Sequence, residues 1–181
     1  MFDFIQSADW AILHGIQDIF RCDFLDFIMP FITVLGNKGA IWILSAIFLM
    51  ISPKYQKYGF VMLGALTACV IVCNISLKNI VARPRPCWLE SVSLLINNPK
   101  DYSFPSGHTM SSVTGAAVLT SANHKFGYFA IPLAVLIAFS RLYLYVHFPS
   151  DVITSVIIGV FIAFTAVRCS ENRYSGKAIQ K

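Results

Sequence analysis

Charged residues are scarce in this chain of 181 residues. Lysine, arginine, aspartate and glutamate together make up 13% of it, whereas hydrophobic residues make up 56%. A typical soluble domain is about 25% charged and about 45–50% apolar. The composition therefore disfavours a soluble globular protein and favours a membrane protein, and the length suits one domain.

Features typical of metal-binding, nucleic-acid-binding and secreted proteins are also missing. No two cysteines form a CxxC pair, and none lies near a histidine at the spacing of metal ligands. The net charge of +5 arises without a run of cations, so we expect no nucleic acid as a partner. Asp3 and Asp9 stand where a signal peptide would carry basic residues, so we expect no cleavable signal peptide.

The cysteines are expected to have packing roles. The five are Cys22, Cys69, Cys73, Cys87 and Cys169. Cys69 and Cys73 lie four residues apart in an apolar run, which predicts small buried core residues. Cys22 and Cys87 fall on the same predicted face, and the sequence leaves a disulfide between them open.

The first segment of the chain is too polar to cross a bilayer. Apolar side chains recur at helical spacing in residues 7–20, and Ser7 stands at the position of an N-cap. We predict an amphipathic helix that lies in the membrane interface. Residues 24–35 form a more apolar segment, and Gly-Asn-Lys-Gly at residues 36–39 then interrupts the pattern.

Five later segments are candidates to cross a membrane. They cover residues 39–52, 57–82, 106–122, 127–146 and 149–168. The first is short for a bilayer core of about 20 residues, and the third is rich in small polar residues, as in a helix buried among helices. We predict an all-α, multi-pass membrane bundle with five transmembrane helices, or six if residues 24–35 also cross. The predicted units are an interfacial segment (1–36), a transmembrane domain (37–170) and a basic cytoplasmic tail (171–181).

The distribution of cations predicts the orientation. Cations gather on the cytoplasmic side of membrane proteins, and alternating spans place seven of them on one side here. These are Lys54, Lys57, Lys125, Arg168, Arg173, Lys177 and Lys181. We therefore predict that this side is cytoplasmic in a cell membrane. Lys78, Arg83, Arg85 and Arg141 fall on the outer side, contrary to the rule, and need another explanation.

Three polar clusters lie at the outer ends of predicted spans. They read KNIVARPRP from Lys78, PSGH from Pro105 and SRLYLYVHFPSD from Ser140. The polar loop 87–104 joins the first two, and two further spans return the chain to the third. We therefore expect all three at one membrane face. The loop is predicted either to roof this site and shape entry to it, or to hold Trp88, Leu95 and Ile96 as ordinary interfacial anchors.

The clusters combine the groups that bind a phosphate. Repulsion among Lys78, Arg85 and Arg141 would cost on the order of several kcal/mol per close pair in a partly dry site, and a bound anion removes this cost. Arginine offers a bidentate fork and lysine a point charge. Ser106 and Gly107 follow a proline expected at the first position of a helix, whose free N–H groups also favour anions. For a single lysine, snorkelling to the headgroups would be the simpler explanation.

Two histidines and a carboxylate supply a reactive group. Asp151 lies in the first turn after His147, so it can hold one ring nitrogen and leave the other as a nucleophile. His108 could then protonate the leaving oxygen. A metal site is the competing use of these residues, but the surrounding cations would repel a metal.

The spacing of these residues resembles the type 2 phosphatidic acid phosphatase (PAP2) superfamily. The family pattern is K-x6-R-P, then P-S-G-H, then S-R-x5-H-x3-D, and its spacing selects Arg85 over Arg83. The matching residues are Lys78, Arg85, Pro86, Pro105, Ser106, Gly107, His108, Ser140, Arg141, His147 and Asp151. The chain is similar in size to the short bacterial members.

The resemblance implies a lipid phosphatase with its site near the outer leaflet. It implies His147 as nucleophile, His108 as acid, and neither a metal nor another cofactor. Family substrates include undecaprenyl diphosphate, phosphatidylglycerophosphate and phosphatidic acid, so the expected partners are a lipid phosphate and the membrane lipids. Two alternatives stay open: a phosphotransferase that uses the same phosphohistidine, and a membrane protein that binds or transports anions without catalysis.

Overall fold

The protein is helical throughout the part that the structure describes. The computed structural model describes the backbone of residues 2–178 and the side chains of residues 4–172. No strand occurs between residues 2 and 178, which confirms the predicted all-α class. In chain order the elements are α1 (Phe2–Phe20), α2 (Asp23–Leu35), the short 3-10 helix η1 (Asn37–Gly39), α3 (Ala40–Ile51), α4 (Gln56–Val70), the π-helical η2 (Ile71–Leu77), α5 (Lys78–Val81), α6 (Pro86–Leu89), α7 (Gly107–Ala122), α8 (His124–Tyr143) and α9 (Pro149–Ala178).

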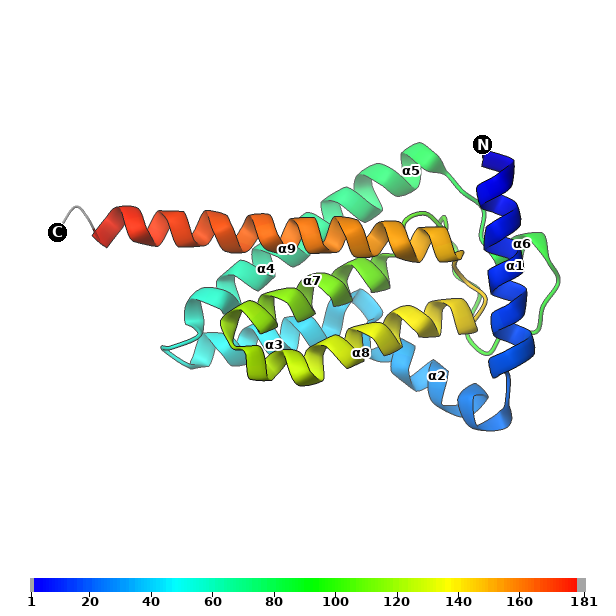
Figure 1. The fold of residues 1–181 in the computed structure, drawn as a ribbon, viewed down its shortest axis with the longest axis horizontal. Coiled ribbons are helices and arrows are strands. Elements are labelled where there is room, and N and C mark those ends of the chain that lie inside the picture. Colours follow the sequence, from blue (N-terminus) through cyan, green and yellow to red (C-terminus); the bar gives the residue numbers. More distant parts are fainter. Residues whose placement is uncertain (1, 179–181) are drawn as a thin grey trace.

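Helix α7 occupies the centre of an elongated bundle. It packs against α3, α4, α8 and α9, while α1 lies across one end (Figure 1). Thr109, Ser112 and Thr114 on α7 are fully buried, and the Thr114 hydroxyl donates to the carbonyl of Gly159 on α9 at 3.0 Å. Small polar residues let helix backbones approach closely and bond across the contact. The expectation that this segment is buried among helices is therefore confirmed.

The outward faces of the bundle are apolar. Phe48, Phe60, Phe129 and Phe161, on α3, α4, α8 and α9, are each more than half exposed. Soluble monomers rarely expose so much contiguous apolar surface. Hydrocarbon is the solvent that suits these side chains, so the protein is a membrane protein.

The number of candidate spans is smaller than predicted. Three helices within the described residues are long and apolar enough to cross a membrane: Gln56–Leu89, His124–Tyr143 and Pro149–Asn172. Helices α2 and α3 add a fourth only as a pair, bent by 44°. The prediction of five or six is not confirmed, because α3 has 12 residues and α7 has 16, whereas a crossing helix needs about 20. Residues 24–35 are one arm of the bent pair instead of a separate sixth span.

Helix α1 differs from the prediction at its start. It begins at Phe2, so Ser7 lies inside the helix and is not its N-cap. Asp9 and Leu13 on α1 are buried, and the helix contacts α8 and α9. The predicted amphipathic helix therefore exists, but its inner face packs against the end of the bundle.

The cationic turns lie at the opposite end from α1. Figure 1 shows the α3–α4 and α7–α8 turns, which carry Lys54 and Lys125, at the end where α9 finishes. The two turns therefore lie at one end of the bundle, and their position on the cytoplasmic side stays a prediction. The side chains of Arg173, Lys177 and Lys181 lie outside the described residues.

The cysteines have free thiols, including Cys22 and Cys87, so no disulfide joins this pair. Cys69 and Cys73 are buried, as predicted.

A close contact between α3 and α7 gives a test of the fold. The indole of Trp42 is buried and donates to the Ser112 hydroxyl at 3.0 Å, and a Cβ at Gly115 would stand 2.5 Å from ring atoms of Trp42. We expect Gly115→Ala to destabilise the protein by about 1–3 kcal/mol through overpacking. Thermal unfolding in detergent, followed by circular dichroism, measures this.

Gly64 on α4 is the matched control, since a Cβ there would meet nothing within 4 Å. Alanine favours a helix over glycine by about 1 kcal/mol, so Gly64→Ala should keep or raise the unfolding temperature. Equal shifts in the two variants would contradict the packing described.

Candidate active site

The backbone after α4 delivers two cations to one end of the bundle. Helix α4 continues through the π-helical η2 into α5, whose first residue is the buried Lys78. π-Helical turns are rare and occur frequently at functional sites. Ala82 then adopts a left-handed conformation with φ 48°, which ends α5 and turns the chain toward Arg83 and Arg85.

Arg85 is buried and held by backbone oxygens. Its Nε donates to the carbonyl of Asp101 at 2.7 Å, and its Nη1 donates to the carbonyl of Val146 at 2.6 Å. The Asp101 carboxylate joins the two cations, because it accepts from Arg85 Nη2 at 2.8 Å and from Lys78 Nζ. Burial opposes ionisation of Asp101, but Lys78 and Arg85 outweigh it and hold the pKa of this carboxyl well below its usual value.

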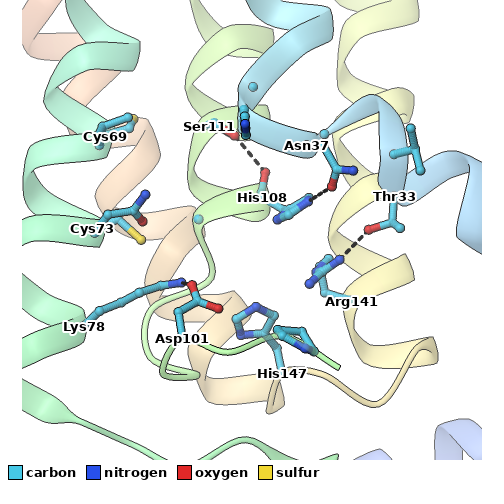
Figure 2. A pocket seen from close by; sticks show the side chains of 18 of the residues that line it. Thr33, Asn37, Cys69, Cys73, Lys78, Asp101, His108, Ser111, Arg141 and His147 are labelled. Atoms are coloured by element: carbon cyan, nitrogen blue, oxygen red, sulfur yellow. Dashed lines mark hydrogen bonds and ion pairs between the residues drawn. The ribbon is translucent and has the colours of Figure 1, made fainter. Parts of the chain in front are cut away.

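The predicted site residues surround one large cavity of about 1340 Å³. Six of the eight line it: Lys78, Arg85, Gly107, His108, Arg141 and His147. Figure 2 shows the two histidines, Lys78 and Arg141 around the same space, with Asp101 against Lys78. Residues 94–99 of the loop 87–104 also line it, so this loop lies at the cavity as predicted. Between α3 and α4 the lining becomes apolar, with Ile43, Leu63 and Val70.

His147 is fixed on both ring nitrogens. Nε2 lies 3.0 Å from Nη1 of Arg85. Nδ1 lies 3.6 Å from Oδ2 of Asp151 and 3.5 Å from the hydroxyl of Ser103. Ser103 also donates to Asp151 Oδ2 at 2.5 Å, so hydroxyl and carboxylate act as one acceptor group. This arrangement suits a neutral imidazole with its proton on Nδ1 and a lone pair on Nε2.

His108 and Arg141 are held by the break between α2 and α3. His108 Nε2 lies 2.8 Å from the side-chain oxygen of Asn37 in η1, where Lys38 and Gly39 have positive φ. Arg141 Nη1 donates to the hydroxyl of Thr33 at 2.5 Å. The Arg141 Nε is buried and makes no hydrogen bond with any residue in the described part of the chain. A buried guanidinium N–H without a partner is costly, and an anion in the cavity would satisfy it.

Two site residues lie behind the cavity. Asp151 is fully buried beneath His147, as an orienting group should be. Ser106 is fully buried too: its hydroxyl is the N-cap of α7, accepting from Thr109 N at 3.4 Å, and its own N–H donates to Ser155. Ser106 does not line the cavity, and its N–H is already bonded to Ser155, so its part in phosphate binding stays a prediction.

The start of α7 also differs from the prediction. The helix begins at Gly107, and Pro105 precedes the cap, joined to Phe104 by a cis peptide bond. Pro105 is thus not the first helical residue, because Ser106 is needed in an extended conformation as the cap. Helix α9 does begin at its predicted proline, Pro149.

Sequence reasoning missed four residues of the site. Asp101 and Ser103 belong to a loop without a motif. Asn37 belongs to the glycine-flanked break between α2 and α3, and the polarity of this break was the only feature of the sequence that pointed to Asn37. Arg83 was set aside on spacing, yet its Nη1 donates to Asp151 Oδ1 at 2.6 Å.

The arrangement of cations and histidines agrees with a family assignment. A model of the PAP2 superfamily matches residues 58–175. The chain belongs to the PAP2 superfamily. This match confirms the resemblance found in the motifs. The chain is accordingly a hydrolase of the PAP2 type.

Several known proteins are similar to this chain over most of their length. An undecaprenyl-diphosphatase of Sulfolobus acidocaldarius is 32% identical over 146 residues, which cover 80% of this chain and 70% of that protein. Undecaprenyl-diphosphatase BcrC of Bacillus subtilis is 31% identical over 160 residues, which cover 88% and 81%. The crystal structure of a PAP2-type phosphatidylglycerolphosphate phosphatase from Bacillus subtilis has a TM-score of 0.76 at 27% identity, covering 93% of this chain and 87% of that one.

The Asp101 carboxylate should compete with anions for the two cations that it joins. We expect Asp101→Asn to tighten binding of inorganic phosphate by about tenfold, since it removes one negative charge beside Lys78 and Arg85. Isothermal titration of the purified protein with phosphate measures this. Asp23→Asn, at an exposed position of α2, is the control and should leave the affinity unchanged. Weaker phosphate binding in Asp101→Asn would show that Asp101 supports the anion site.

Proposed function

We propose that this PAP2 protein is a lipid phosphatase that works through a phosphohistidine on His147. The observation that carries the proposal is the convergence of three buried or largely buried cations and two histidines on one cavity with an apolar side. Anion binding alone would need only the cations. A histidine held by Asp151 on one nitrogen and directed to the cavity with the other suits nucleophilic attack.

In the first step, Nε2 of His147 attacks phosphorus while the bond to the leaving oxygen breaks. The negative charge of the bound phosphate offsets the cations around His108 and keeps this imidazole protonated, so His108 can give its proton to that oxygen. Asp151 stabilises the imidazolium form of the new phosphohistidine. Arg85 turns its Nη1 from Nε2 to an equatorial phosphate oxygen, and Lys78 and Arg141 hold the others, which stabilises the charge of the transition state.

In the second step, water attacks the phosphohistidine and the P–N bond breaks. The proton from the water goes to His108, which is then ready for the next cycle. Inorganic phosphate leaves and His147 returns to its neutral form. General acid catalysis of this kind contributes about 10²–10⁴-fold to a rate.

For the substrate we propose a polyprenyl diphosphate such as undecaprenyl diphosphate. Two relatives at 31–32% identity carry the name undecaprenyl-diphosphatase. The cavity joins a cationic end to an apolar wall between α3 and α4, which suits an anionic headgroup on a hydrocarbon chain. Phosphatidylglycerophosphate is the second candidate, because the similar crystal structure belongs to a phosphatase for that class of lipid.

We further propose that the site faces the extracytoplasmic side of the cell membrane. The turns with Lys54 and Lys125 lie at the other end of the bundle (Figure 1), and such cations mark the cytoplasmic end. In this orientation α1 lies in the outer interface. Helix α7, shielded from lipid by its neighbours, crosses as an inner helix, and with the bent α2–α3 pair the crossings number five.

The histidines give the direct test. We expect His147→Ala to abolish phosphate release from undecaprenyl diphosphate in detergent, and His108→Ala to lower kcat by about 10²–10⁴-fold. His14→Ala is the control, since this histidine lies on α1 and pairs with Glu90 outside the cavity. Chelator should leave the parent rate unchanged. Undiminished turnover in His147→Ala would disprove the nucleophile.

The same assay separates the candidates for the lipid and the acceptor. We compare kcat/KM for undecaprenyl diphosphate, phosphatidylglycerophosphate and phosphatidic acid. The proposal requires undecaprenyl diphosphate to have the highest value. Added alcohols report the alternative reaction: phosphorylated alcohol as the main product would make the protein a phosphotransferase.

The pH dependence follows from the surroundings of His147. Burial, followed by the charges of Arg85, Arg141 and Lys78, lowers the pKa of this imidazole well below its usual value. The nucleophile must be neutral, and it is lost only as the pH falls through the lowered pKa. We therefore expect the acidic limb of the kcat/KM profile below pH 6.5, the ordinary histidine value. A limb at or above this value would contradict the environment described.

A further inference from the structure

Asp9 is a buried carboxylate on α1 that is bonded to the start of α9 and to the segment before α6. The residue is about 3% exposed. Oδ1 accepts from the Ser150 N–H at 2.8 Å, and Oδ2 accepts from the Ser150 hydroxyl at 2.5 Å and from Arg83 Nη2 at 2.7 Å. Burying a carboxylate costs several kcal/mol unless it is paired, so these contacts fix the position of α1 at the site.

Arg83 joins Asp9 to the carboxylate beneath the nucleophile. While Nη2 contacts Asp9, Nη1 donates to Asp151 Oδ1 at 2.6 Å and to the Ser150 hydroxyl at 2.8 Å. The guanidinium carbon lies 4.0 Å from the centre of the Phe148 ring, which packs against its face. Arg83 does not line the cavity, so its charge is directed to the two carboxylates and away from the substrate.

Asp151 is therefore held from two sides. Oδ1 faces Arg83, while Oδ2 accepts from Ser103 at 2.5 Å and from the Phe148 N–H at 2.9 Å and lies 3.6 Å from His147 Nδ1. The guanidinium fixes the plane of the carboxylate. The positive charge of Arg83 also weakens the attraction between Asp151 and a protonated His147. Asp9, on the far side of Arg83, partly neutralises this positive charge and so reduces its effect.

We propose that Asp9 and Arg83 are positioning residues that act through Asp151 on His147, so that α1 is part of the catalytic centre. The proposal rests on the role of His147 given under Proposed function. Helix α1 lies outside the residues that match the family model, and Arg83 is outside the motif positions. The chain Asp9–Arg83–Asp151–His147 thus connects the amino-terminal helix to the reacting nitrogen through four side chains.

The two residues should move the protonation of His147 in opposite directions. The other charged or titratable groups around the imidazole are Arg85, Arg141, Lys78, His108 and Asp101, and none of them changes in these variants. Asp9→Asn leaves the Arg83 charge less compensated, which disfavours imidazolium and moves the acidic limb of kcat/KM to lower pH. Arg83→Gln frees the Asp151 charge and moves this limb to higher pH. Each shift should be about 0.5–1 unit.

The experiment compares the full-length parent, Asp9→Asn, Arg83→Gln and Asp18→Asn. Asp18 is an exposed carboxylate on the same helix, so its variant controls for the loss of one charge. We expect Asp9→Asn and Arg83→Gln to lower kcat by about 10–100-fold with little change in KM, since a misplaced catalytic group costs this much. Asp18→Asn should match the parent.

A second readout does not depend on turnover. Nitrogen-15 NMR of histidine-labelled protein at neutral pH reports which ring nitrogen of His147 carries the proton, with His147→Gln to assign the signals. The parent should hold the proton on Nδ1, and Asp9→Asn and Arg83→Gln should lower that fraction. Arg83→Gln leaves Asp9 bonded to Ser150, so it tests the coupling even if Asp9→Asn does not fold.

The outcomes separate this inference from the function it rests on. If both variants match Asp18→Asn in kcat, pH limb and NMR signal, the positioning role is overturned. If the NMR signals change as expected while the parent releases no phosphate from any lipid tested, the coupling stands and the phosphatase function fails.

Discussion

Positive charge buried at one end of an apolar bundle is the constraint on which the rest of the structure depends. Lys78, Arg85 and Arg141 could not share a partly dry cavity without compensation. Asp101 pairs with the first two, while Arg141 relies on Thr33, and its buried Nε has no partner among the described residues. The helix ends and loops at this end are arranged to deliver these groups, and the remaining helices supply the frame that holds them.

Two arginines two residues apart have different roles for a geometric reason. Pro84 and Pro86 fix φ on either side of Arg85 and keep the segment extended, while the left-handed Ala82 sets its direction. Arg85 thus reaches the cavity wall, and Arg83 reaches the two carboxylates behind it. The same chemical group faces the cavity in one case and holds the carboxylate beneath His147 in the other.

Motif spacing predicted the gathering of Lys78, Arg85, His108, Arg141 and His147, because helices that cross a bilayer return the chain to the same face. It could not place Asp101, Ser103 or Asn37, whose positions depend on loop conformations that only tertiary contacts decide. The positions of Arg83 and Asp9 at the site were not predicted for a related reason, since nothing in the sequence says where an interfacial helix will pack. Fewer helices than predicted qualify as spans by length and composition, because α3 and α7 are shorter than independent crossing helices and rely on neighbours.

The break between α2 and α3 has a consequence for how a lipid would reach the histidines. The cavity continues past this break to Ile43, Leu63 and Val70, and Ile43 and Val70 are also exposed on the hydrocarbon-facing surface. A substrate with a long hydrocarbon chain could enter the cavity laterally from the membrane, while its tail stays among the surrounding lipids. Entry from this side would favour phosphates that are attached to membrane lipids over phosphates that are dissolved in water.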